Sequence, residues 1–141
     1  MGVRVKLVIK SKFSGTSVHV SALVNTGYEV EEPEILLPRR LAEYLNIPLT
    51  PPEARTLVYE TPTGFYRLLF IPKGVDVHLV DVCVEVKDVH ITVADHEREV
   101  LISDKLAGAL GIQLINIAEG IWRHERDPLE VKRKSTPPEY W

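Results

Sequence analysis

Short segments of alternating apolar and polar residues run through most of the chain, and they constrain its fold more than any other feature. In residues 3–10, VRVKLVIK, every second residue is apolar and the residues between are mostly basic. A period of two is typical of a β-strand with one buried face, because successive side chains point to opposite sides. Alternation or a short apolar run predicts further strands at 17–24, 35–37, 55–60, 65–71, 75–86, 88–94, 99–102 and 112–117. The sequence therefore predicts a mostly β protein.

Turn residues separate these strands. Residues 13–16, FSGT, predict a turn that pairs the first two strands as a hairpin. Thr61-Pro62-Thr63-Gly64 predicts a tight hairpin connection, because Gly64 is free to take a positive φ. Pro72-Lys73-Gly74 predicts another turn, and a shift in the apolar alternation near Val80-Asp81 predicts a bulge or a break.

Two short helices are expected among the strands. Pro38 opens the segment PRRLAEYLN, where a missing N–H costs nothing because the first helical turn leaves it unbonded. Ser103 and Asp104 precede KLAGALG, which predicts an N-cap, and Gly111 is placed to end that helix.

Length and charge exclude several classes of protein. The chain has 141 residues, which fits one domain with its own core. A formal net charge of −3 gives no general attraction to phosphate backbones, so no nucleic-acid partner is expected. No apolar run approaches the roughly 20 residues of a membrane span, and the alternating N-terminus does not resemble a signal peptide. The single Cys83 forms no internal disulfide, which favours a cytoplasmic location.

Two further compositional features bear on habitat and organisation. Gln, Asn, Cys and Met are scarce, as in proteins from hot environments. Residues 122–141 are charged, contain Pro and lack periodicity, so we expect a domain at 1–121 followed by a C-terminal tail that is loosely attached or ordered by a partner.

The strand predicted at 17–24 runs directly into Asn25-Thr26-Gly27. Asn-x-Gly triplets are common at turns, so a simple turn after a strand is the plain interpretation. A second pattern along the chain favours a more specific one.

The chain resembles the retropepsin-like aspartic proteases in two separated patterns. ALVNTG at 22–27, followed by ILLPRRLAEYLNI at 35–47, is similar to the family's strand ending in Asp-Thr/Ser-Gly, apolar strand and helix. EVLISDKLAGALGIQLI at 99–115 is similar to the family's closing strand, helix and Leu-Gly-Ile. The resemblance covers residues 3–117, and its two patterns occur in the family's order.

This resemblance implies a small closed β-barrel of the acid-protease type with two short helices. It implies a homodimer, because each subunit of the family contributes one such triplet to a shared active site. Asn25, Thr26 and Gly27 would then occupy the catalytic loop, and Thr61, Pro62, Thr63 and Gly64 a substrate-binding flap hairpin. A peptide or protein ligand would lie in the groove between subunits, and neither a cofactor nor a metal is implied.

The departure from the family's pattern is Asn25. In the family two carboxylates lie close together and share one proton, and the ionised partner takes a proton from water. The amide of Asn25 has no proton to lose near neutral pH and cannot act as a general base. A chain with Asn25 is therefore expected to keep the architecture without peptidase activity. Asn is either natural to a non-catalytic peptide-binding or scaffold relative, or a replacement for Asp that traps an inactive form.

Other chemistry-bearing residues have plainer interpretations. The four acids from Glu29 to Glu34 are expected to form a solvated loop, with an acidic rim that binds basic peptides or a cation as the alternative, and Asp104 is expected to cap its helix. His90 and His96 lack a ligand spacing that would specify a metal, and Cys83 is expected to be a small buried residue.

Overall fold

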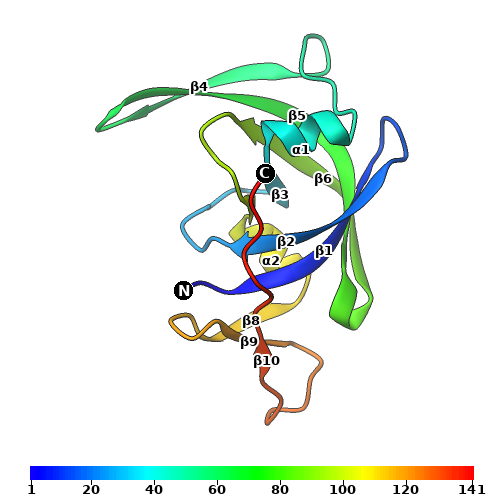
Figure 1. The fold of residues 1–141 in the computed structure, drawn as a ribbon, viewed down its shortest axis with the longest axis vertical. Coiled ribbons are helices and arrows are strands. Elements are labelled where there is room, and N and C mark those ends of the chain that lie inside the picture. Colours follow the sequence, from blue (N-terminus) through cyan, green and yellow to red (C-terminus); the bar gives the residue numbers. More distant parts are fainter.

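Six strands close into a β-barrel that forms the body of the molecule (Figure 1). The computed structural model describes the backbone of residues 1–141 and the side chains of residues 1–58 and 62–141. The barrel strands are β1 (Arg4–Ser11), β2 (Ser17–Val24), β3 (Glu34–Pro38), β5 (Gly64–Leu79), β6 (Val84–Ala94) and β7 (Val100–Ile102). Their order is β1-β2-β7-β3-β6-β5, and β5 pairs back with β1. The expectation of a mostly β fold with a small closed barrel is confirmed.

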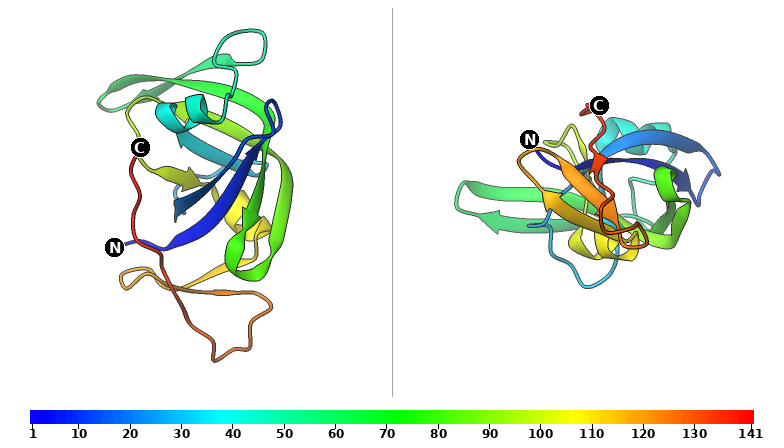
Figure 2. Two further views of the ribbon diagram at one scale, coloured as in Figure 1. Left: turned by 45° about the vertical axis from the view of Figure 1, so that its right-hand side comes forward. Right: turned by 90° about the horizontal axis from the view of Figure 1, so that it is seen from below.

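The strand β4 (Arg55–Thr61) pairs with β5 and stands outside the barrel. The resulting hairpin extends away from the barrel, as two views agree (Figures 1 and 2). The predicted hairpin is thus present, but the turn predicted at 72–74 is wrong. The strand β5 continues through it with a shift in register against β6 between Ile71 and Val75, and Lys73 has a φ of 53°. Such an irregularity bends the strand without ending it.

Two short helices follow two of the barrel strands, as the sequence predicts. They are α1 (Arg39–Tyr44), after β3, and α2 (Asp104–Ala109), after β7. The hydroxyl of Ser103 caps α2 by accepting the N–H of Leu106 at 3.1 Å, and Gly111 ends it with a φ of +80°. Leu41 and Leu106 are fully buried against the barrel. Among the described residues, no helix has the length and apolar character that crossing a bilayer requires.

The short strand β7 lies between β2 and β3, parallel to β2 and antiparallel to β3. Because β2 and β7 are parallel, their carboxyl ends meet, and Val24 lies opposite Ile102. The loop after β2 therefore begins beside the segment that leads into α2. Asn25, the first residue of this loop, is therefore positioned by the pairing of β2 with β7.

The predicted break near Val80 is confirmed as a 3₁₀ turn, η1 (Val80–Val82), between β5 and β6. Cys83 follows it with a φ of 54° and is exposed. The expectation that Cys83 is buried is wrong, because the break removes it from the alternating pattern of the strand.

The last strands form a second, smaller sheet. It has the order β10-β9-β8 and consists of β8 (Ile112–Asn116), β9 (Ile121–His124) and β10 (Arg133–Lys134). The strand predicted at 112–117 is therefore present, but it lies outside the barrel.

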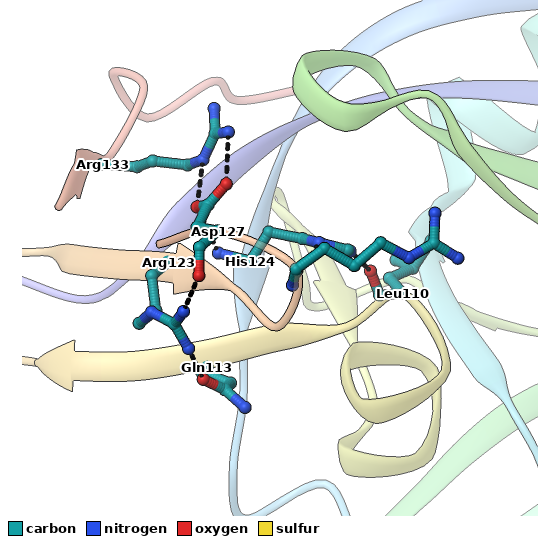
Figure 3. A network of polar contacts seen from close by, with 7 residues as sticks. Leu110, Gln113, Arg123, His124, Asp127 and Arg133 are labelled. Atoms are coloured by element: carbon teal, nitrogen blue, oxygen red, sulfur yellow. Dashed lines mark hydrogen bonds and ion pairs between the residues drawn. The ribbon is translucent and has the colours of Figure 1, made fainter. Parts of the chain in front are cut away.

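Asp127 ties this sheet together (Figure 3). Its carboxylate accepts two hydrogen bonds from Arg133, at 2.8 and 2.9 Å, and one from the backbone N–H of His124 at 2.8 Å. The guanidinium of Arg133 also lies over the ring of Trp122, 5.6 Å from its centroid, and Trp122 is buried. His124 is buried as well, and its Nε2 donates to the carbonyl of Leu110 at 3.0 Å because Nδ1 accepts the N–H of Arg126.

The chain then returns along the barrel to its last residue. The N–H of Thr136 donates to the carbonyl of Arg4 at 3.0 Å, and the hydroxyl of Ser21 donates to the carbonyl of Pro137 at 2.7 Å. Figure 1 shows this segment crossing the barrel near the N-terminus. Residues 133–141 are thus attached along their length, contrary to the loose attachment expected from composition.

Candidate functional site

The loop after β2 is a turn built around the side chain of Asn25. Its Oδ1 accepts the N–H of Gly27 at 3.0 Å, and its backbone carbonyl accepts the N–H of Tyr28 at 3.0 Å. Its own N–H donates to the carbonyl of Ile102 at 3.2 Å, across to the end of β7. An Asn side chain commonly closes such a turn. One accepted bond leaves a second lone pair on Oδ1, so Asn25 keeps both an acceptor and its amide nitrogen for a ligand.

The segment that begins α2 fixes the far end of this loop. The N–H of Asp104 donates to the carbonyl of Tyr28 at 3.0 Å, and its Oδ1 accepts the N–H of Val30 at 3.3 Å. The buried Ser103 hydroxyl accepts the N–H of Glu34 at 3.1 Å in addition to capping α2. Asp104 has a structural role, as expected, but it does not cap α2. Ser103 supplies that cap, and Asp104 holds the Asn25 loop.

Thr26 and Gly27 are exposed at the tip of the loop. Within the described part of the chain, no hydrogen bond involves the hydroxyl of Thr26. The backbone of Gly27 does not need the conformational freedom of glycine. Its φ is not in the positive region, and an added Cβ would meet Asn25 Oδ1 at 3.4 Å, an ordinary contact.

A cavity of about 580 Å³ opens beside this loop. Asn25 and Gly27 border it on one side, and Tyr66 and Leu68 of the β4–β5 hairpin border it on another. The hairpin thus lines the same cavity as the loop that the sequence singled out. The two features are far apart in sequence, and the fold brings them to one cavity.

The residues expected to bind substrate in the hairpin are placed differently. Thr61 lies outside the residues whose side chains are described. Pro62, Thr63 and Gly64 are exposed, and none of these three borders the cavity. The hairpin residues that border the cavity lie further along β5, where every second side chain points toward it. Tyr66 is held there by Thr63, whose hydroxyl lies 2.9 Å from the phenol oxygen.

A polar cluster at the cavity was missed by the sequence analysis. Glu34 Oε2 accepts hydrogen bonds from the hydroxyl of Tyr28 and, at 2.9 Å, from the hydroxyl of Thr92. These residues come from the loop after β2, the start of β3 and the last part of β6. Since β3 and β6 pair in parallel, residues separated by 58 positions become neighbours. A single sequence carries little signal for such a pairing.

His96 borders the same cavity and packs against the hairpin. Its ring lies 5.1 Å from the ring of Tyr66, measured between centroids. His90 is used elsewhere, since its Nδ1 accepts the N–H of Lys73 at 3.0 Å and its Nε2 contacts Glu32. Over the described residues, no group of three or more His, Cys, Asp or Glu side chains is arranged to hold a metal ion.

Comparison with known proteins adds no family or relative: no protein-family model matches the chain, and no curated protein is significantly similar to it. What the protein does must therefore be inferred from the Asn25 loop and the cavity beside it.

Proposed function

We propose that the protein is a homodimeric relative of the retropepsin-like aspartic proteases that does not hydrolyse peptides, because Asn25 stands in place of the catalytic Asp. One observation carries this proposal. A strand of a closed barrel ends in Asn-Thr-Gly at a cavity of about 580 Å³, and a hairpin borders that cavity from another side. A cavity lined by both a loop and a hairpin, with apolar walls and a few polar groups, suits a bound peptide.

The second copy is proposed because one triplet supplies half of a dyad. The exposed hydroxyl of Thr26 has no partner among the described residues, and Gly27 is not required by its own backbone. Both properties suit a loop tip that another subunit approaches closely. In Figure 1 the N-terminus, the loop after β2 and the β4–β5 hairpin lie toward one side of the molecule.

The strand β8 offers a surface for this pairing. In the described part of the chain it is hydrogen-bonded to β9 alone and so forms an edge of the small sheet. Ile115 and Ile117, in and after β8, are 42% and 55% exposed. An unpaired edge with apolar side chains favours pairing with another strand, and a second copy would present the same edge.

The chemistry follows from the amide. A pair of carboxylates across the dimer axis holds one proton, so that one member acts as base and the other as acid. The amide of Asn25 donates and accepts hydrogen bonds but does not take a proton from water. The groove would then bind an extended peptide and leave it intact.

Two measurements test the proposal. The mass of the purified chain in solution is expected to be that of a dimer. Asn25→Asp is expected to cleave an unstructured protein at acidic pH, with inhibition by pepstatin, while the parent chain stays inactive. The proposal would be overturned if the parent chain and the Asn25→Asp variant were both monomeric, or if the parent chain cleaved the protein.

A non-catalytic scaffold on the same fold is the second candidate. Asn25 itself favours this candidate. Its side chain closes the loop without supplying acid–base chemistry, and binding a peptide needs only the closed loop. If Asn25→Asp remains inactive while the parent chain binds peptides, this second function is the better one.

A further inference from the structure

The cavity beside Asn25 is acidic. Glu29 and Glu34 border it, and among the described residues that line it none is Lys or Arg. His96 is the lining side chain that could carry a positive charge. A cleft lined by one sign of charge attracts ligands of the opposite sign.

Glu34 is the carboxylate best placed to bind a cation. It is partly buried at the first position of β3. Both of its backbone groups are bonded to Ser103, whose hydroxyl accepts its N–H and whose N–H donates to its carbonyl, each at 3.1 Å. A carboxylate held in this way does not have to be ordered when a ligand binds, which favours affinity.

One oxygen of Glu34 is left for a ligand. Tyr28 and Thr92 both donate to Oε2, and Thr92 is itself buried. Within the described residues, Oε1 accepts no hydrogen bond. A carboxylate can accept about four hydrogen bonds, so Glu34 keeps the capacity to accept from a ligand.

Apolar side chains line the approach to this carboxylate. Leu36, Leu68 and Leu101 border the same cavity, and they belong to a small apolar cluster that also includes the ring of Tyr28. An apolar wall that leads to a carboxylate suits a side chain with a long aliphatic stem and a positive head.

We infer that the cavity binds the side chain of a lysine or arginine from an extended peptide, with its stem along the leucines and its charged group on Glu34. This inference rests on the proposed peptide groove and adds the class of ligand to it. A peptide carrying Glu at the same position would place a second carboxylate against Glu34 and would be excluded.

The test uses the purified full chain and short labelled peptides that differ at one position. In matched sets, Lys, norleucine or Glu is moved along an otherwise uncharged peptide, and binding is measured by fluorescence anisotropy. Norleucine keeps the aliphatic stem and removes the charge. At one register the Lys peptide is expected to bind about tenfold or more tightly than the norleucine peptide, since hydrogen bonds to charged groups are the strong ones.

Two matched variants assign the effect to Glu34. Glu34→Gln keeps the acceptor for Tyr28 and Thr92 and is expected to abolish the preference for Lys. Glu31→Gln removes one negative charge from an exposed position that does not border the cavity, and it is expected to keep the preference. Equal binding of Lys and norleucine peptides by the parent chain would overturn the inference without any variant. So would a Lys preference that survives in a folded Glu34→Gln chain.

Failure of this inference can be told apart from failure of the proposed function. If Asn25→Asp cleaves peptides with no preference for Lys or Arg, the inference is wrong and the protease relationship stands. If Asn25→Asp is inactive while the parent chain prefers Lys peptides through Glu34, the inference stands and the non-catalytic scaffold is the better function. If no peptide binds to either chain, both are wrong.

Discussion

The side-chain oxygen of Asn25 accepts the backbone N–H of Gly27 at 3.0 Å, and this bond closes the loop that borders the cavity. The bond needs an acceptor at this position and nothing more. A carboxylate is also an acceptor, and of similar shape, so Asn and Asp are interchangeable for the loop and differ in their acid–base chemistry. The architecture and the proposed reaction are therefore separable at one residue.

The first prediction separates the two roles of Asn25. Asn25→Asp is expected to leave the free energy of unfolding in urea unchanged at acidic pH, where the acceptor for the N–H of Gly27 remains and the two carboxylates of the proposed dimer share a proton. Asn25→Ala is expected to lower it by about 1 kcal/mol, the usual contribution of one hydrogen bond. Peptide cleavage at acidic pH is expected for the Asp variant and absent for the Ala variant. Equal destabilisation by both substitutions would show that the loop depends on the amide nitrogen instead.

The second prediction concerns Ser103, whose buried hydroxyl serves both α2 and β3. Ser103→Ala removes the acceptor for two backbone N–H groups, those of Leu106 and Glu34. We expect the free energy of unfolding to fall by about 2–3 kcal/mol, combining a lost N-cap with an unsatisfied buried donor. Ser17→Ala, at an exposed position of β2, is the control and should leave stability unchanged within about 0.5 kcal/mol. A loss below that of a single cap would argue against the second bond.

The third prediction is a pH dependence in the small sheet. The hydrogen bonds from Arg133, and then the one from the N–H of His124, hold the pKa of Asp127 well below its usual range. A depressed pKa stabilises the folded state above the unfolded value of about 4, and this contribution is lost as the pH falls toward the folded value. Fluorescence of Trp122, which lies under Arg133, is expected to report loosening of the sheet below about pH 4.

Two variants check that assignment. In Asp127→Asn the acidic transition of Trp122 fluorescence should disappear, because the group that titrates has been removed. Glu125→Gln changes an exposed carboxylate nearby and should leave the transition in place. An unchanged transition in Asp127→Asn would assign it to another group.

The fourth prediction concerns the last residue of the chain. The N–H of Trp141 donates to the carbonyl of Arg98 at 2.7 Å, and its side chain packs against the main core. Trp141→Ala is expected to cost about 2 kcal/mol, in line with the removal of a partly buried aromatic side chain. Hydrogen exchange should increase in residues 95–99, which include the cavity residue His96. Leu129→Ala, at a position 87% exposed, is the control and should change neither quantity.

Local features of the fold could be predicted from the sequence, and those that depend on long-range pairing could not. The first strand, the hairpin that ends in β5 and the cap at Ser103 follow from patterns within a few residues. The contact between Glu34 and Thr92 depends on parallel pairing of β3 with β6, which leaves no mark in either strand. Lys73 is a smaller case: a Pro-Lys-Gly run suits a turn and a bulge equally well, and the pairing of β5 with β6 decides between them.

The attachment of the C-terminal segment has the same kind of cause. Asp127 pairs with Arg133 inside the small sheet, and the carbonyl of Pro137 accepts the hydroxyl of Ser21 from the barrel. Composition alone does not distinguish such a segment from a solvated tail, because the partners lie elsewhere in the chain. The candidate loop and the run of acids beside it were within reach of the sequence, and the contacts of Glu34 with Tyr28 and Thr92 at the cavity were not.

The last prediction tests the proposed dimer at β8. Ile115→Asp combined with Ile117→Asp places charges on an exposed apolar edge, where burial against a second copy would be costly. Sedimentation is expected to show the parent chain at twice the mass of the chain and the double variant at the mass of one. Because both side chains are exposed in the single chain, thermal stability at low concentration should change little. Leu129→Asp adds a charge at a more exposed residue outside β8 and should remain dimeric. If that variant dissociates as readily as the β8 variant, net charge rather than the β8 edge controls assembly. If the β8 variant stays dimeric, the second copy binds at another surface.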